Sequence, residues 1–132
     1  MDLSTYIIPF TLSQSDNFLM ESSGIIRLEA KHLVMEYQSR DAVLGMVKSS
    51  VNEVRLSLND VQHITFKKGL FSNTLRIQAK AMRAFEKVPG SVQGAVELKI
   101  KRADRKNAEY MVSAANLRMS EMKLEALGEI DD

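Results

Sequence analysis

The stretch ITFKKGLFSNTLRIQA, residues 64–79, holds the residues with the clearest potential for recognition. It contains two consecutive lysines, a glycine and two large apolar residues, namely Lys67, Lys68, Gly69, Leu70 and Phe71. Lysines can hydrogen-bond phosphate, and exposed apolar side chains can enter a bilayer or a protein partner. The alternative is a hairpin connection with a solvated basic flank, because glycine and asparagine suit a tight turn.

The two lysines and the two apolar residues of this stretch carry different expectations. Lys67 and Lys68 are consecutive in or beside a strand, so their side chains are expected on opposite faces, which weakens a shared phosphate site. Leu70 and Phe71 are harder to explain, because a turn does not require two large apolar side chains. Packing back over the sheet is the favoured interpretation. Contact with a partner chain and insertion into a bilayer are the alternatives, in that order.

A second group of cations lies in KIKRADRK, where the last predicted strand meets the predicted helix. Its members are Lys99, Lys101, Arg102, Arg105 and Lys106. This group could bind phosphate, but a solvated strand face and helix start is the favoured interpretation, because Glu97 and Asp104 interrupt the positive field. Aromatic residues that would stack on bases do not interleave with these cations, so no nucleic acid partner is expected.

Residues typical of catalysis or cofactor binding are few. His32 and His63 are the only histidines, and their separation does not suggest a metal pair. Cysteine is absent, and GLFSN lacks the second glycine and the lysine of a nucleotide-binding loop. The carboxylates are scattered without an activating neighbour at a defined spacing. We therefore expect no enzyme activity, no catalytic residue, no metal site and no cofactor.

Length and composition predict a single domain. The chain has 132 residues, 45% of them hydrophobic, with 18 basic against 17 acidic residues and a formal charge of +1. This balance gives no global attraction for nucleic acid or anionic lipid. The apolar runs are far too short to span a membrane, and the start MDLSTYIIPF lacks the features of a signal peptide. A cytoplasmic protein is expected, with peripheral membrane association as an alternative.

Alternation of apolar and polar residues predicts a series of strands between residues 25 and 101. Hairpin and turn signals are AKH at residues 30–32 and ND at residues 59–60, whereas SRDAVLGMVKSS reads as a long irregular loop. Residues 1–20 read as an N-terminal arm, and Pro9 argues against a central strand there. The predicted core positions are Ile26, Leu28, Leu33, Met35, Leu56, Leu58, Ile64, Leu75, Ile77, Val96, Leu98 and Ile100.

The apolar period changes from two to 3.6 after residue 104, which predicts a helix with Asp104 as its N-cap. Met111, Val112 and Ala115 should cover one end of the sheet. We therefore expect a mainly β fold, an antiparallel barrel of six to seven strands capped by a C-terminal helix. The domain should span residues 21–127, preceded by the arm and followed by an acidic tail at residues 128–132.

This order resembles the pleckstrin-homology-like superfold, in particular the GRAM and bacterial pleckstrin-homology-like domains. GIIRLEAKHLVMEY is similar to their first hairpin, VRLSLNDVQHI to the next strand and turn, and AVELKI followed by ADRKNAEYMVSAANLRM to their last strand and capping helix. The capping helix carries no tryptophan, and the first hairpin offers only Lys31 and His32 as cations beside Glu29. The phosphoinositide site of such domains is therefore not carried over.

Two functions remain open. The preferred one is a non-enzymatic interaction module that binds a protein, including another copy of itself, because Leu124 and Leu127 extend the apolar character of the helix beyond the barrel. The alternative is a peripheral module for membranes or anionic ligands such as phospholipids, using the basic junction and the KKGLF turn. The two differ in their sensitivity to salt, because ionic contacts weaken with screening.

Overall fold

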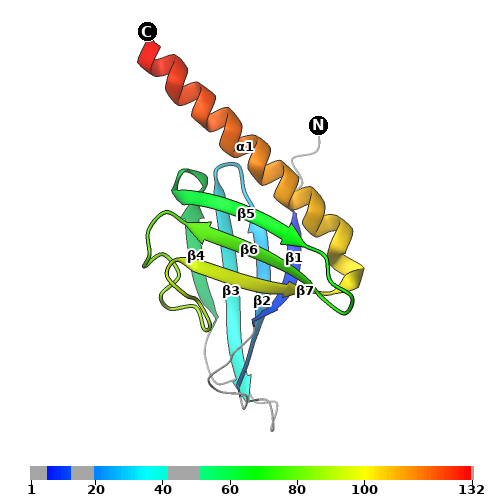
Figure 1. Cartoon of the computed structure of the whole chain (residues 1–132). Helices are drawn as coiled ribbons and strands as arrows, with labels where there is room; N and C mark the ends of the chain where they lie inside the picture. The colour runs from blue at the N-terminus through cyan, green and yellow to red at the C-terminus, as the bar shows by residue number, and fades with distance from the viewer. Residues whose placement is uncertain (1–5, 13–19, 42–50, 132) are drawn as a thin grey trace.

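A computed structural model describes residues 6–12, 20–41 and 51–131. Seven strands precede one long helix (Figure 1). The strands are β1 (Ile7–Leu12), β2 (Met20–Leu28), β3 (His32–Asp41), β4 (Asn52–Ser57), β5 (Val61–Lys67), β6 (Asn73–Ala79) and β7 (Ala95–Ile100). Two 3₁₀ turns, η1 (Leu58–Asp60) and η2 (Arg102–Asp104), precede β5 and the helix α1 (Arg105–Asp131).

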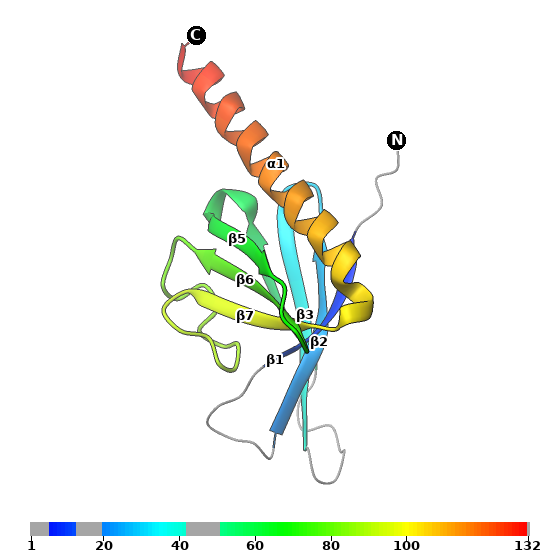
Figure 2. The ribbon, with the colours of Figure 1, turned by 45° about the vertical axis from the view of Figure 1, so that its right-hand side comes forward.

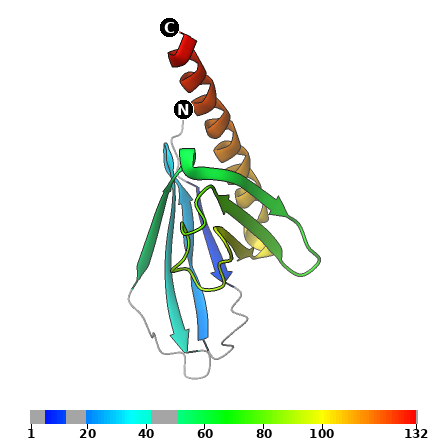
Figure 3. The same cartoon turned by 60° about the vertical axis from the view of Figure 1, so that its left-hand side comes forward.

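The seven strands form one antiparallel sheet in the order β4-β3-β2-β1-β7-β6-β5. The sheet curls strongly, so that β5 to β7 cross over the face of β2 to β4 (Figures 1 and 3). The expected mainly β class with a C-terminal helix is confirmed. The barrel remains open between β4 and β5, which are the two edge strands of the described sheet and are joined through η1 rather than by a ladder.

Strand β1 is central, between β2 and β7, which corrects the expectation that Pro9 excludes a central strand. The physical reason is the length of the two ladders. Strand β1 pairs with β2 along its whole length, with Pro9 opposite Ile25, but it pairs with β7 only at Thr11 and Leu12. Pro9 therefore lies where β1 has a ladder partner on one side only, a position at which the missing N–H is tolerated.

The predicted core is confirmed. Each of the twelve strand and turn positions named above is buried, and Met111, Val112 and Ala115 of α1 are buried against them. The alternation predicts this because one face of each strand turns toward the interior. Further core residues come from two segments without a strong pattern: Ile8, Phe10 and Leu12 of β1, and Phe85 and Val88 of the connection from β6 to β7.

Strands β2 and β3 approach each other closely at Gly24. Gly24 faces Tyr37 in the register of these strands. A Cβ atom built on Gly24 would lie 1.8 Å from the carbonyl oxygen of Glu36 and 2.7 Å from the Cα of Tyr37. Only glycine allows the two backbones to approach this closely.

Helix α1 starts directly after Asp104, as the N-cap signal predicts, and continues to Asp131, through most of the segment expected as an acidic tail. Its first half lies across β5 and the open side of the curled sheet, and its second half extends past the sheet (Figures 1 and 2). Asn116 donates from Nδ2 to the carbonyl oxygen of Ile64 at 3.4 Å, which covers part of the β5 edge. The irregular loop expected over residues 39–50 is corrected at its start, because residues 39–41 continue β3, and residues 42–50 lie outside the described residues.

Candidate functional site

The connection between β5 and β6, residues 68–72, is held by the start of the helical segment. Arg102 donates from Nη2 to the carbonyl oxygen of Leu70 at 3.1 Å. Arg105 donates from Nη2 to the carbonyl oxygen of Gly69 at 3.3 Å. The structure therefore joins the two cation groups that the sequence predicted separately, since the junction after β7 braces the loop (Figure 1).

Asn73 anchors the base of this loop. Its side chain is fully buried and donates from Nδ2 to the carbonyl oxygen of Ile100 at 3.3 Å, while its Oδ1 accepts from Nε of Arg105 at 3.0 Å. Gly69 is required for a close approach, because a Cβ at this position would lie 2.3 Å from the carbonyl oxygen of Ser72. Sequence reasoning identified Asn73 only as a turn residue and missed its anchoring role.

Leu70 and Phe71 form the tip of the loop and point into solvent. Leu70 is 82% exposed and Phe71 is 95% exposed, the two highest values among the exposed large apolar residues of the described chain. The favoured expectation, that they fold back over the sheet, is therefore wrong. Arg102 and Arg105 hydrogen-bond the carbonyl oxygens of Leu70 and Gly69, which ties the backbone of the loop to the start of the helical segment and not to the core.

The two lysines before the tip separate as strand geometry predicts. Lys68 turns toward α1, where its Nζ lies 3.0 Å from Oε1 of Glu109. Lys67 remains exposed opposite Thr74 in the β5–β6 register. The register continues from Thr74 to Lys99 of β7 and from Lys99 to Thr11 of β1. Lys67 and Lys99 therefore belong to one row across the outer face of the sheet.

Lys99 and Lys101 border a hollow on this outer face. The hollow has a volume of about 440 Å³ and is lined by Pro9, Phe10, Thr11, Ser23, Gly24, Ile25, Gln38, Lys99 and Lys101. Sequence reasoning identified the two lysines but not the β1 and β2 residues beside them. The missing signal was the place of β1 in the sheet, since β1 brings Thr11 next to Lys99.

We call Leu70 and Phe71 the apolar tip, and the cations around it the basic rim: Lys67, Lys68, Lys99, Lys101, Arg102, Arg105 and Lys106. Three of the rim residues, Lys68, Arg102 and Arg105, contact protein oxygens. The other four are exposed lysines, and among the described residues none of them has an ion-pair partner. These four lysines are the cations that remain available to an external anion.

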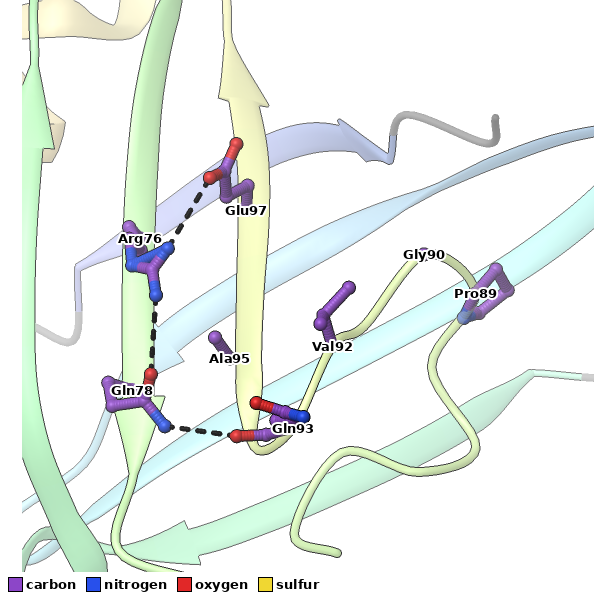
Figure 4. Close-up of a pocket in the computed structure, with 8 residues that line it drawn as sticks. All are labelled: Arg76, Gln78, Pro89, Gly90, Val92, Gln93, Ala95 and Glu97. Atoms are coloured by element: carbon purple, nitrogen blue, oxygen red, sulfur yellow. Dashed lines mark hydrogen bonds and ion pairs between the residues drawn. The ribbon is translucent and has the colours of Figure 1, made fainter. Parts of the chain in front are cut away.

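A second hollow, on the outer face of β6 and β7, has fewer polar groups available to a ligand than the hollow beside Lys99 and Lys101. It has a volume of about 420 Å³ and lies beside the turn at residues 89–93 (Figure 4). Its polar side chains bind one another: Arg76 contacts Glu97 at 3.5 Å and Gln78 at 3.2 Å, and Gln78 donates to the carbonyl oxygen of Gln93 at 3.2 Å. Since these groups are already paired, the hollow has little with which to select a ligand.

The strongest electrostatic cluster of the described chain lies away from the basic rim, on β2, β3 and β4. Arg55 donates to Glu29 at 2.6 Å and Arg27 donates to Glu29 at 3.1 Å, and these hydrogen bonds lower the pKa of the Glu29 carboxyl below its ordinary value. Arg27 also donates to Glu36, and the hydrogen bonds to Glu36 and Glu29 raise its own pKa. Every charged group of this cluster has a partner, which is typical of a structural role.

The described part of the chain contains no group of side chains arranged for catalysis or for metal binding. Among those residues, no three His, Cys, Asp or Glu side chains are grouped to hold a metal ion. His32 begins β3 and His63 lies in β5, on strands that are not neighbours in the sheet. No helix within the described ranges is both long enough and apolar enough to cross a bilayer.

The chain was compared with protein families and with curated protein sequences. No family model matches it, and no curated protein matches it. The class that the coordinates define is an open, curled antiparallel sheet of seven strands with a C-terminal helix. Its most distinctive surface is the apolar tip with its basic rim.

Proposed function

We propose that the protein is a non-enzymatic binding module that docks on anionic membrane surfaces through the apolar tip and the basic rim. The observation that carries this proposal is the exposure of Leu70 and Phe71, at 82% and 95%, on a loop that two arginines brace. A braced loop loses little conformational entropy on binding, so more of the burial energy of its side chains contributes to affinity.

The proposed contact combines two weak contributions. Burial of a leucine or phenylalanine side chain in the acyl region contributes about 1.5–3 kcal/mol. Each lysine close to an anionic leaflet contributes about 1 kcal/mol, and four lysines of the basic rim have no ion-pair partner among the described residues. One such signal gives only marginal attachment, whereas the two together give measurable and reversible binding.

The resemblance to pleckstrin-homology-like domains fits a binding role without chemistry, but the proposed surface does not depend on it. The hairpin loop that would hold a phosphoinositide in such domains has few cations here. The proposal therefore concerns general attraction to an anionic surface and not a stereospecific headgroup site. The hollow beside Lys99 and Lys101 is where a phosphate of a lipid headgroup could contact the basic rim.

The test uses the absence of tryptophan from the chain. Phe71→Trp gives a protein with one indole, whose emission should shift to the blue with vesicles containing about 30% phosphatidylserine, because the indole enters the interface. Neutral vesicles should give no shift. An unchanged spectrum with both kinds of vesicle would contradict the proposal.

Co-sedimentation with the same vesicles separates the two contributions. Phe71→Ser should abolish binding while leaving the unfolding transition unchanged, since the side chain is exposed. Val92→Ser is the matched control, because Val92 is also exposed but lies on the turn before β7. Raising the salt from about 0.1 M to about 0.5 M should release the native protein by screening the rim. Equal sedimentation of both variants would refute the role of the tip.

A second candidate function, protein binding, is favoured by a separate observation. The helix α1 carries exposed leucines on a face that the sheet does not cover. This surface lies apart from the apolar tip in sequence and suits a protein partner better than a bilayer.

A further inference from the structure

Helix α1 has apolar residues on two opposite sides. Ala108, Met111, Ala115 and Met119 are buried against the sheet. Tyr110, Leu117 and Leu124 recur every seven residues, and they are 54%, 62% and 67% exposed. Seven residues are almost two helical turns, so the three side chains lie within about 40° of one another around the axis. With 3.6 residues per turn, this places them on the side opposite to the buried stripe.

We call Tyr110, Leu117, Leu124 and the neighbouring Leu127, which is also exposed, the outer stripe. Tyr110, Leu117 and Leu124 form a row on the solvent side of the helix, with Leu127 on its flank. Such a row is more than single exposed apolar residues, which need no explanation. The second half of α1 extends past the sheet (Figures 1 and 2). Leu124 and Leu127 are 67% and 57% exposed. The seven-residue repeat is the spacing that one helix presents to another.

We propose that the outer stripe pairs with the same stripe of a second copy of this chain, in antiparallel orientation. Tyr110 and Leu124 are equally distant from Leu117 in the sequence. A two-fold axis at Leu117 therefore places Leu117 against its counterpart and Tyr110 of each copy against Leu124 of the other. A stripe with this internal symmetry is self-complementary, which is the condition for a two-fold interface.

Charge determines the orientation of the pair. Lys106 and Glu109 lie in the first turns of α1, and Lys123 and Glu125 lie in its second half. In the antiparallel register centred on Leu117, Lys106 lies within about one helical turn of Glu125 of the other copy, and the two charges attract. Glu109 is already paired with Lys68 and is not needed for this contact. A parallel pair would separate Lys106 from Glu125 of the other copy by about 28 Å along the helices, so this attraction would be lost. Antiparallel helix dipoles add to the same preference.

The arrangement of the fold permits this contact. Because the outer stripe faces away from the sheet, the two sheets of a pair would lie on opposite sides of the paired helices, without contact between them (Figure 2). Ser113 and Ser120 lie between the apolar positions and keep the seam narrow. A concentration-dependent equilibrium between monomer and dimer is therefore expected. This pairing shares only Lys106 with the proposed membrane contact and does not require a membrane.

Cysteine cross-linking tests the orientation cleanly, because the chain has no cysteine of its own. In a glutathione redox buffer without lipid, a mixture of Tyr110→Cys and Leu124→Cys should form disulfide-linked pairs, whereas each variant alone should not. Leu117→Cys should link to itself. Self-linking of Tyr110→Cys would show a parallel pair and overturn the proposal. Met82→Cys is the control, because Met82 is exposed and lies outside α1. If none of the three cross-linking tests gives more disulfide-linked dimer than this control, the proposal is also overturned.

Analytical ultracentrifugation of the native chain tests the pairing itself. The mean mass should rise from one copy toward two between roughly 5 and 300 µM. Leu117→Lys should shift this transition at least tenfold to higher concentration, and Met82→Ser should leave it in place. Lys106→Glu and Glu125→Lys should each weaken pairing, and the double variant should restore it. A native chain that stays monomeric throughout, or a Leu117→Lys protein that pairs as well as the native one, would refute the proposal.

Discussion

Arg105 donates through Nε to Oδ1 of Asn73 at 3.0 Å, and this contact fixes the loop to the start of α1. Asn73 is fully buried and uses its amide group to reach Ile100 at the end of β7. One asparagine side chain thus connects β6, β7 and the helix. The position of the apolar tip depends on this connection, although the side chains of Leu70 and Phe71 lie almost wholly in solvent.

Asn73→Ala should lower the free energy of unfolding by about 1–3 kcal/mol, because the buried carbonyl of Ile100 loses its side-chain donor. Urea unfolding followed by circular dichroism measures this change. Ser72→Ala is the control, since Ser72 is exposed and adjacent. Asn73→Asp keeps an acceptor for Arg105 but loses the donor to Ile100, so it separates the two contacts. A fully stable Asn73→Ala protein would show that the anchor contributes little.

Leu98→Ala should lower the free energy of unfolding by about 2–5 kcal/mol through lost burial and the cavity left behind. Leu98 is fully buried in β7, opposite Leu12 on one side and Leu75 on the other. Leu70→Ala is the matched control and should change stability by less than about 0.5 kcal/mol, because its side chain is already in solvent. Equal stability of the two variants would contradict the described core.

Two glycine substitutions should act in opposite directions. Gly24→Ala should destabilise the fold by more than the usual overpacking cost of about 1–3 kcal/mol, because the added Cβ meets backbone atoms that cannot move alone. Gly128→Ala should stabilise by about 0.5–1 kcal/mol, since it lies in α1 and its Cβ would meet nothing. Thermal unfolding compares the two variants. A tolerated Gly24→Ala would mean that β2 and β3 can separate.

The cluster around Glu29 should contribute to acid sensitivity. Arg55 and Arg27 lower the pKa of Glu29 in the folded chain, so the folded state holds its proton less tightly than the unfolded state. The stabilisation is therefore present above the ordinary glutamate pKa of 4.5 and is lost as the pH falls through the lower folded value. Glu29→Gln should flatten the fall in stability below about pH 5. If the stability of Glu29→Gln falls at acid pH as steeply as that of the native protein, the cluster does not contribute to the acid sensitivity.

Much of the fold could be predicted from alternation, because half-buried strands must place every second residue in the core. Leu33, Leu56 and Leu98 follow from this reasoning alone. Strand β1 could not be predicted in the same way, since the effect of Pro9 depends on how far β7 extends beside it. The burial of Phe85 and Val88 was not predicted either. A connection that packs on the core through two isolated residues shows no regular spacing of apolar residues.

The candidate site was predictable in its residues but not in its arrangement. Lysines and arginines in two short stretches could be read directly, and the separation of Lys67 from Lys68 followed from strand geometry. The exposure of Phe71 could not be read, because it depends on hydrogen bonds from Arg102 and Arg105 that form only after folding. The local sequence does not indicate which backbone carbonyl an arginine from a distant segment will hydrogen-bond.

The central position of β1 has a consequence for the order of folding. Thr11 and Lys99 are register partners, so the first described strand must wait for the last one before the sheet is continuous. Contacts this distant in sequence slow folding, because the entropy of closing a long loop is lost before the ladder contributes any stabilising hydrogen bonds. While the ribosome is still producing β7, the apolar side chains of β1 have only β2 beside them. Exposed apolar surface and unpaired strand edges make partly folded chains prone to aggregation, so this interval is the one in which the central position of β1 carries its cost.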